Sequence, residues 1–142
     1  MKVNIYTLMS SIYDPDSGVS VVKINTDVGV FEGIAHCHPE EKYESRMFGC
    51  ELAELRAIRK YLRELVKIGN AQFDALYHLY NSVYDMKDFN YDNFYASKIR
   101  RAMYAKKDEI DKNKEEIERI DIRIKAMPKE REIIMKKVRG SI

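Results

Sequence analysis

The first part of the chain alternates apolar and polar side chains over short runs. Residues 3–9 follow the period of two of a half-buried strand, 19–24 are rich in β-branched residues, and 30–37 extend again. The segments 10–18 and 25–29 between these runs contain turn-forming Asp, Pro, Asn and Gly. Because short connections favour antiparallel pairing, this pattern predicts a three-stranded antiparallel meander.

Apolar residues then recur every three or four positions, which predicts an amphipathic helix over 43–69. Gly69-Asn70 is a plausible C-terminal cap for it. Neither the helix nor the meander can bury its apolar side alone, so the helix is expected to lie across one face of the sheet. The apolar stripe consists of Phe48, Leu52, Leu55, Ile58, Leu62 and Leu65.

The remaining chain predicts a shorter helix with an aromatic, Asn-rich loop over 71–95, and a long basic helix with a short final helix over 95–139. Apolar residues at heptad spacing form a seam on the long helix, and Pro128 is expected to bend or end it. A helix of this length cannot fold back completely over so small a sheet. The seam is therefore expected to be covered by a second copy of the chain.

Length and composition add a prediction of one α+β domain over 1–142, in which 1–40 form the meander. The 142 residues are 45% hydrophobic and 34% charged, which suits one folded unit. No apolar run approaches the ~20 residues of a membrane span, and no signal-peptide pattern occurs at the N-terminus. Two cysteines cannot form a secreted disulfide framework, so a reducing cytoplasm is expected.

Charge is distributed unevenly along the chain. Residues 1–95 contain 10 Lys and Arg against 14 Asp and Glu, whereas residues 96–142 contain 15 against 9. A basic C-terminal part favours an anionic partner.

Two groups of arginines stand out. Arg56, Arg59 and Arg63 lie on one face of the first helix without an acidic residue three or four positions away, so this face is either simply solvated or binds an anion. On the long helix, Arg119 and Arg123 are one turn apart. Glu115 can pair with Arg119, whereas Arg123 has no acidic residue within reach on its own helix.

Catalytic and metal-binding signatures are weak. His36, Cys37, His38 and Cys50 offer nitrogen and sulfur ligands, but adjacent residues of a strand point to opposite faces. Cys37 and Cys50 are better explained as small buried residues. The chain carries no phosphate-binding loop, nucleophile motif or dinucleotide fingerprint. We therefore expect no enzyme activity, no metal and no cofactor.

The aromatic segment is the best candidate for contacts to a base. Phe89, Tyr91 and Phe94 alternate there with Asn90 and Asn93. An aromatic ring can stack on a base, and an Asn amide can bond a ribose or a base edge. Together with nearby arginines, these residues have the composition of a nucleotide-binding site.

This arrangement resembles the Thoeris anti-defence sponge family, first type, which phages use against bacterial TIR-domain immunity. The shared features are the small N-terminal sheet, the helix containing Gly49-Cys50-Glu51-Leu52-Ala53-Glu54-Leu55-Arg56-Ala57, the aromatic and Asn-rich middle, and the long basic helix. The resemblance implies a non-catalytic phage protein of the host cytoplasm that binds and sequesters a cyclic ADP-ribose isomer. It also implies a homodimer or hexamer whose pockets are built by two subunits.

The family's pocket combines arginines, a stacking aromatic residue and an Asn. The resemblance places Arg119 and Arg123 in it, and Arg56 or its rival Arg59. It leaves the aromatic residue open among Phe89, Tyr91 and Phe94, and the Asn open between Asn90 and Asn93. Some members of the family additionally hold cyclic oligonucleotides. The alternative is a phage inhibitor, similar to an anti-CRISPR protein, that binds a host protein or nucleic acid through the same basic faces; a DNA-binding protein is disfavoured by the small net charge.

Overall fold

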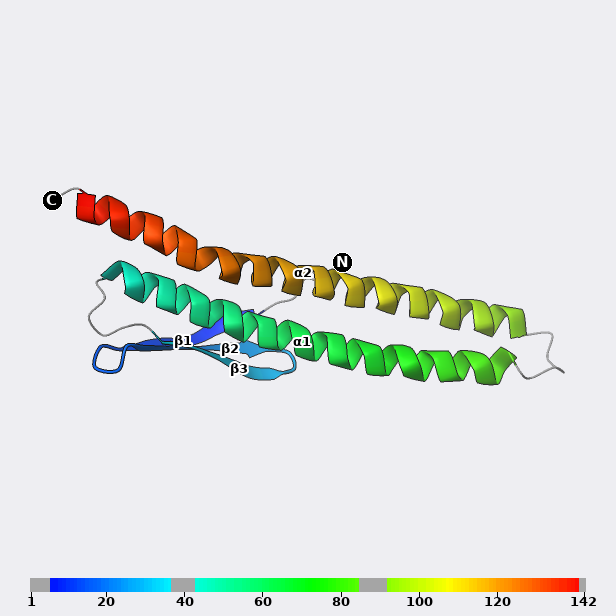
Figure 1. The fold of residues 1–142 in the computed structure, drawn as a ribbon. Helices are drawn as coiled ribbons and strands as arrows, with labels where there is room; N and C mark the ends of the chain where they lie inside the picture. The colour runs from blue at the N-terminus through cyan, green and yellow to red at the C-terminus, as the bar shows by residue number, and fades with distance from the viewer. Residues whose placement is uncertain (1–5, 37–42, 85–91, 141–142) are drawn as a thin grey trace. The chain divides into compact units, whose positions relative to one another are not determined.

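The computed structural model contains an antiparallel sheet followed by two long helices, which confirms the α+β class (Figure 1). It describes residues 6–36, 43–84 and 92–140, with side chains over 6–36, 48–83 and 94–127. The elements are β1 (Tyr6–Asp14), β2 (Val19–Thr26), β3 (Gly29–His36), α1 (Tyr43–Tyr84) and α2 (Asp92–Gly140).

The contacts group the chain into two compact units. The first unit is Met1–Tyr61 with Ile117–Ile142, and the second unit is Leu62–Glu116. The boundary between the units falls inside both helices. It lies after Tyr61 in α1 and after Glu116 in α2, so each helix contributes residues to both units.

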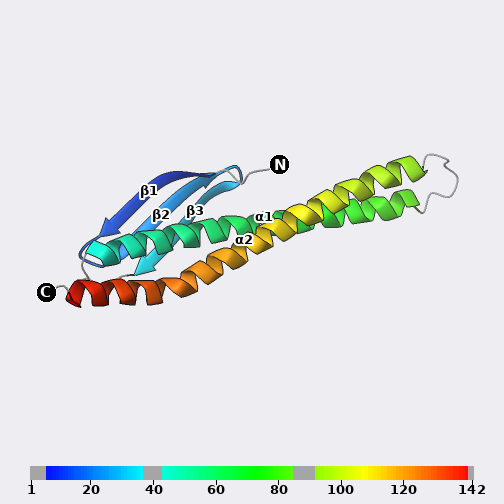
Figure 2. The ribbon, with the colours of Figure 1, turned by 90° about the horizontal axis from the view of Figure 1, so that it is seen from above.

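The sheet of the first unit is the expected meander, in the order β1-β2-β3 with antiparallel pairing throughout. Its register is regular between β2 and β3, and it is interrupted by a bulge between Leu8 and Ser10 of β1. Gly29 has a φ of 132°, which L side chains rarely adopt, and it closes the β2–β3 turn. Figure 2 shows β1 and β3 at the two edges of the sheet.

One face of this sheet packs against the first part of α1, as expected, but it does so through small residues. A side chain at Gly33 would meet the backbone of Ala53 and Ala57, so strand and helix are in direct contact there. Leu55 lies two residues from both alanines and therefore on the opposite side of α1. The leucine stripe identified the helix, whereas Ala53, Ala57 and Tyr61 form the side that meets the sheet. The core of this unit is Ser20, Val22, Ile24, Ala35, Ala53, Ala57, Tyr61, Ile120 and Met127.

Residues 117–127 of α2 pack on the side of α1 that faces away from the sheet. Glu51 and Arg59 of α1 form ion pairs with Arg123 and Asp121 of α2. The first unit therefore has three layers, with the first part of α1 between the sheet and the last part of α2 (Figure 1).

The prediction that Gly69-Asn70 ends the first helix is wrong, because α1 runs without interruption to Tyr84. Gly69 is buried, and a Cβ there would lie 2.7 Å from Cγ1 of Ile110 in α2. The glycine thus permits close approach of two helices instead of ending one. Pro128 does not end the second helix either, since α2 continues to Gly140.

Part of the expected seam of the long helix is covered within the chain. Ile110, Ile120 and Met127 are each at most 6% exposed, and the close contact of Ile110 is with Gly69 of α1. Asn113 of the same seam is also buried. Met103, Ile117 and Ile124 of the seam are only half-buried, so its cover by a second copy of the chain stays a prediction.

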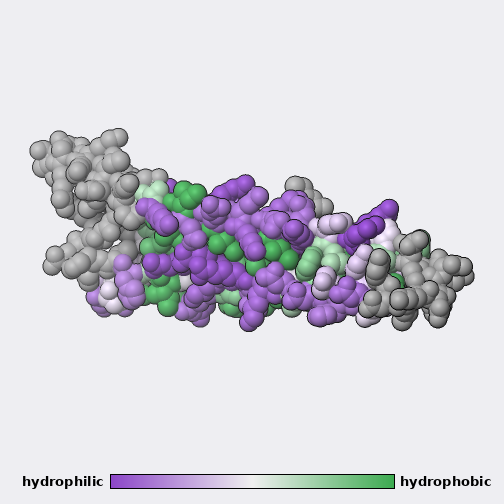
Figure 3. Space-filling model, turned by 45° about the vertical axis from the view of Figure 1, so that its right-hand side comes forward, coloured by the Kyte–Doolittle hydropathy of each residue, from purple (hydrophilic) through white to green (hydrophobic). Residues whose placement is uncertain are grey.

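Hydrophilic side chains cover most of the coloured surface in Figure 3, with hydrophobic patches between them. Among the residues that the structure describes, no helix has a stretch long and apolar enough to span a membrane.

Candidate anion-binding site

Arg123 is the best-oriented arginine of the predicted site. Its Nε and Nη2 atoms both donate to Oε1 of Glu51, over 3.2 and 2.8 Å. The expectation that Arg123 has no acidic partner considered only its own helix, whereas Glu51 comes from α1. The pair is partly exposed, at 39% and 41% of the two side chains. A single carboxylate oxygen therefore holds the guanidinium plane while the group remains accessible from solvent.

Arg119 lies one turn before Arg123 on α2 and is exposed. Positions four apart on a helix lie on the same side, about 6 Å apart along the axis. The two guanidinium groups together offer the fork geometry that matches phosphate oxygens.

Arg56 is not brought to this pair. Its Nη1 donates to the carbonyl oxygen of Ile34 in β3, over 2.6 Å. Arg56 lies five residues after Glu51, which corresponds to a rotation of about 140° around the helix. Within one chain, Arg56 and Arg123 therefore point to different sides of α1.

The rival residue Arg59 is also engaged in the first unit. Its Nη1 donates to Oδ1 of Asp121 over 2.7 Å, and its Nε is buried with no hydrogen-bond partner among the described residues. Lys60 next to it donates to the carbonyl oxygen of Glu32, over 2.7 Å. Arg56, Arg59 and Lys60 thus hold α1 to β3 and α2. The two alternatives considered for this face, solvation and anion binding, therefore do not describe these three side chains.

The predicted aromatic loop is partly helical. Phe94 lies in the first turn of α2, not in a loop, and belongs to the second unit. Its ring is 58% exposed and packs edge-on against Tyr95, with the centroids 5.6 Å apart. Asn93 lies in the same turn, and its side chain is outside the described set. Phe89, Asn90 and Tyr91 fall outside the described residues altogether.

The sequence shows Arg100 and Arg101 without acidic partners after the aromatic segment, but it was not used to predict the single exposed aromatic and basic face on this part of α2. Lys98, Arg101 and Tyr104 follow Phe94 at steps of four, three and three residues, so all four lie on one side of the helix. Nζ of Lys98 lies 4.6 Å from the centroid of the Phe94 ring, and Tyr104 is 66% exposed. The absence of Asp and Glu between residues 93 and 107 was the signal that could have revealed this face.

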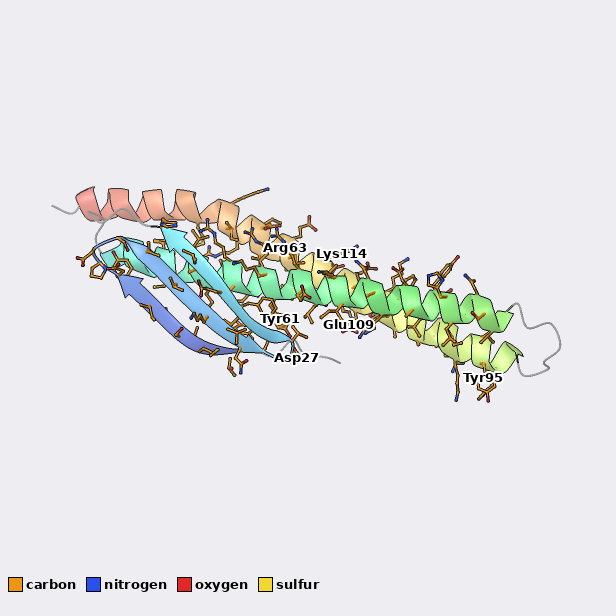
Figure 4. The ribbon with its side chains drawn as sticks, turned by 90° about the horizontal axis from the view of Figure 1, so that it is seen from below. Asp27, Tyr61, Arg63, Tyr95, Glu109 and Lys114 are labelled. Carbon is orange, nitrogen blue, oxygen red and sulfur yellow. The ribbon has the colours of Figure 1, made fainter. Side chains whose placement is uncertain are left out.

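Elsewhere in the first unit, Tyr61 links α1 to the β2–β3 turn. Its hydroxyl donates to Oδ1 of Asp27 over 2.8 Å, and both residues are labelled in Figure 4. Its ring stacks on Phe31. Burial, followed by the hydrogen bond and the negative charge of Asp27, raises the pKa of Tyr61 to about 12. This group is therefore neutral near pH 7 and has a structural role.

The cysteine and histidine residues do not assemble a metal site in the described part of the chain. Cys50 is a free thiol that donates to the hydroxyl of Ser20 over 3.8 Å. His36 is exposed at the end of β3, and Cys37 and His38 fall outside the described residues.

Comparisons with known proteins add no further assignment: no family model, no curated protein and no solved structure matches this chain.

Proposed function

We propose that this protein is a non-catalytic phage anti-defence protein that binds and sequesters a cyclic nucleotide signal, a cyclic ADP-ribose isomer, in the host bacterial cytoplasm. The observation that carries the proposal is the Arg119–Arg123 pair, with Arg123 oriented by Glu51. A pre-oriented guanidinium loses less conformational entropy on binding than a free one. Arg119 lies one turn before Arg123, and two guanidinium groups at this spacing suit the two phosphates of a pyrophosphate.

The base and ribose contacts of this proposal come from the aromatic segment of a second subunit, because Phe94 lies 25 residues before Arg119 along α2 and does not reach the Arg119–Arg123 pair within one chain. Phe94 offers an exposed ring, and Phe89, Asn90 and Asn93 remain candidates for stacking and hydrogen bonding. Sequestration requires only retention, so the protein must be more abundant than the signal and the dissociation constant must lie below the protein concentration.

The first test is incubation with an extract of cells in which a TIR-domain defence is active, followed by heat release and mass spectrometry. An intact cyclic nucleotide is expected. Recovery of a hydrolysed product would show catalysis instead of sequestration, and release of no nucleotide would contradict the proposal.

The second test is calorimetry with the recovered ligand. Loss of a charge-assisted hydrogen bond costs about 1.5–3 kcal/mol, so Arg123→Ala and Arg119→Ala should each weaken binding by about ten- to a hundredfold. Arg100→Ala removes an exposed arginine from the same helix and serves as the matched control. Equal affinity of all three variants would exclude the Arg119–Arg123 pair as the anion site.

A second candidate is favoured by the exposed face of Phe94, Lys98, Arg101 and Tyr104. Aromatic rings interleaved with cations suit single-stranded nucleic acid, as an inhibitor acting on a nucleic acid or its complex would require. Binding of a single-stranded oligonucleotide that falls steeply with salt and is lost in Arg101→Ala would favour this function. Salt-insensitive binding of a small nucleotide would favour sequestration.

A further inference from the structure

The two edge strands of the sheet, β1 and β3, differ in whether their outer carbonyl groups accept hydrogen bonds from the rest of the chain. At the β3 edge, Arg56 and Lys60 donate to the carbonyl oxygens of Ile34 and Glu32. Four residues of a helix span about 6 Å along its axis, and two residues of a strand span about 6.6 Å. Arg56 and Lys60, one turn apart on α1, therefore reach the carbonyl oxygens of two β3 residues that are two positions apart. These carbonyl groups are therefore not available to another strand.

The β1 edge has no such cover in the described part of the chain, where β1 pairs with β2 alone. Natural edge strands avoid unwanted pairing with charged side chains, especially Lys, or with Pro. Residues Tyr6–Tyr13 contain neither, although Leu8, Met9 and Ile12 are 55%, 55% and 61% exposed. The bulge between Leu8 and Ser10 interrupts this edge, but the regular stretch from Ser10 to Tyr13 is uncharged and contains the exposed Ile12, and an exposed edge without charges is a site for strand addition.

The sheet face that points away from α1 carries an apolar row ending at this edge. Val21 pairs with Ile12 on one side and with Ile34 on the other, so the three side chains lie in line across the sheet. Ile34 is 39% exposed. The row ends at Ile12 on the open edge strand β1, where the side chain is exposed to solvent.

We propose that β1 pairs antiparallel with β1 of a second copy of this chain, forming a six-stranded sheet in a twofold dimer. A strand that adds to this edge must itself be uncharged and apolar at matching positions, and β1 meets that requirement. Antiparallel pairing of identical strands is isologous, and the covered carbonyls at β3 leave one open edge per copy. The assembly therefore closes at two chains.

The register is centred on Ile12. It places Ile12 against the partner's Ile12, and Asp14 against the partner's Ser10, so that the two Asp14 carboxylates do not meet. The apolar row of Ile34, Val21 and Ile12 then continues through the same row of the partner. This interface is independent of the Arg119–Arg123 site, so either proposal can fail without the other.

The test is the mass in solution of the full chain, by light scattering and sedimentation. We expect twice the 16.7 kDa of one chain. Ile12→Lys places two like charges opposite each other at the twofold axis and should weaken the dimer about tenfold or more. Val30→Lys changes an equally exposed residue on the same face of the other edge strand and should leave the dimer intact. Circular dichroism of both variants confirms folding.

Hydrogen exchange of the wild-type protein at low and high concentration supplies a second readout. Amides of β1 should become more protected with concentration, and those of β3 should not. A monomer at all concentrations, a dimer unaffected by Ile12→Lys, or equal loss of the dimer in Val30→Lys would each overturn the proposal.

Discussion

Gly33 of β3 lies directly on the backbone of α1 at Ala53. A Cβ atom at Gly33 would overlap the carbonyl oxygen of Ala53 and would lie 2.6 Å from the backbone nitrogen of Ala57. Both obstacles are backbone atoms of a helix and cannot rotate away. The contact sets how closely the sheet and α1 approach.

Gly33→Ala is therefore expected to destabilise the protein by at least the ~1–3 kcal/mol typical of overpacking. Denaturant unfolding followed by circular dichroism measures the change. Ile34→Ala, at the neighbouring and partly exposed position, is the control and should cost less. A Gly33→Ala variant as stable as the wild type would mean that β3 does not rest on α1 at this point.

Gly69→Ala tests the second unit. Alanine gains about 1 kcal/mol of helix propensity over glycine, but its Cβ would lie 2.7 Å from Cγ1 of the buried Ile110. The cost of overpacking, about 1–3 kcal/mol, exceeds or cancels that gain, so we expect no stabilisation or a net loss. In an Ile110→Ala background the same substitution should stabilise. Stabilisation by Gly69→Ala in the wild-type background would show that α2 does not pack on Gly69.

Alkaline unfolding tests the Tyr61–Asp27 contact. The folded pKa of Tyr61, about 12, lies above the ordinary tyrosine value of 10.0. The stabilisation that this shift represents is complete below pH 10 and is lost as the pH rises from 10 to 12, because the unfolded chain releases the proton first. Tyr61→Phe removes this dependence and one hydrogen bond, at a cost of about 0.5–1.5 kcal/mol.

Stability measured between pH 8 and 12 checks this prediction, with Tyr95→Phe, which alters an exposed tyrosine, as the control. An unchanged slope above pH 10 in Tyr61→Phe would contradict it.

Arg59→Ala tests the attachment of α2 to α1. The Arg59–Asp121 pair is partly shielded, with 24% and 36% of the side chains exposed. We expect a loss of about 1–2 kcal/mol, against roughly 0.3–0.5 for an exposed helix pair. Lys112→Ala breaks such an exposed pair with Asp108 and is the matched control. Chemical denaturation of both variants decides the question, and equal losses would mean that shielding adds nothing at Arg59.

The sequence by itself determined the three strands and where the two long helices begin. Alternation of apolar and polar residues produced the three strands, because successive side chains of a strand face opposite sides. The period of Phe48, Leu52 and Leu55 likewise identified the first helix. Both patterns involve only residues close together in the sequence, so they can be recognised without knowledge of the tertiary contacts.

Only the tertiary structure decided where the helices end and which residues meet. Gly69 has the sequence signature of a helix cap, yet Ile110 packs on it, since the absence of a Cβ serves close packing as well as chain reversal. Arg123 lacks an acid on its own helix, yet Glu51 reaches it from α1. An ion pair depends on distance in space, so the pairing of two residues 72 positions apart cannot be predicted from their spacing in the sequence.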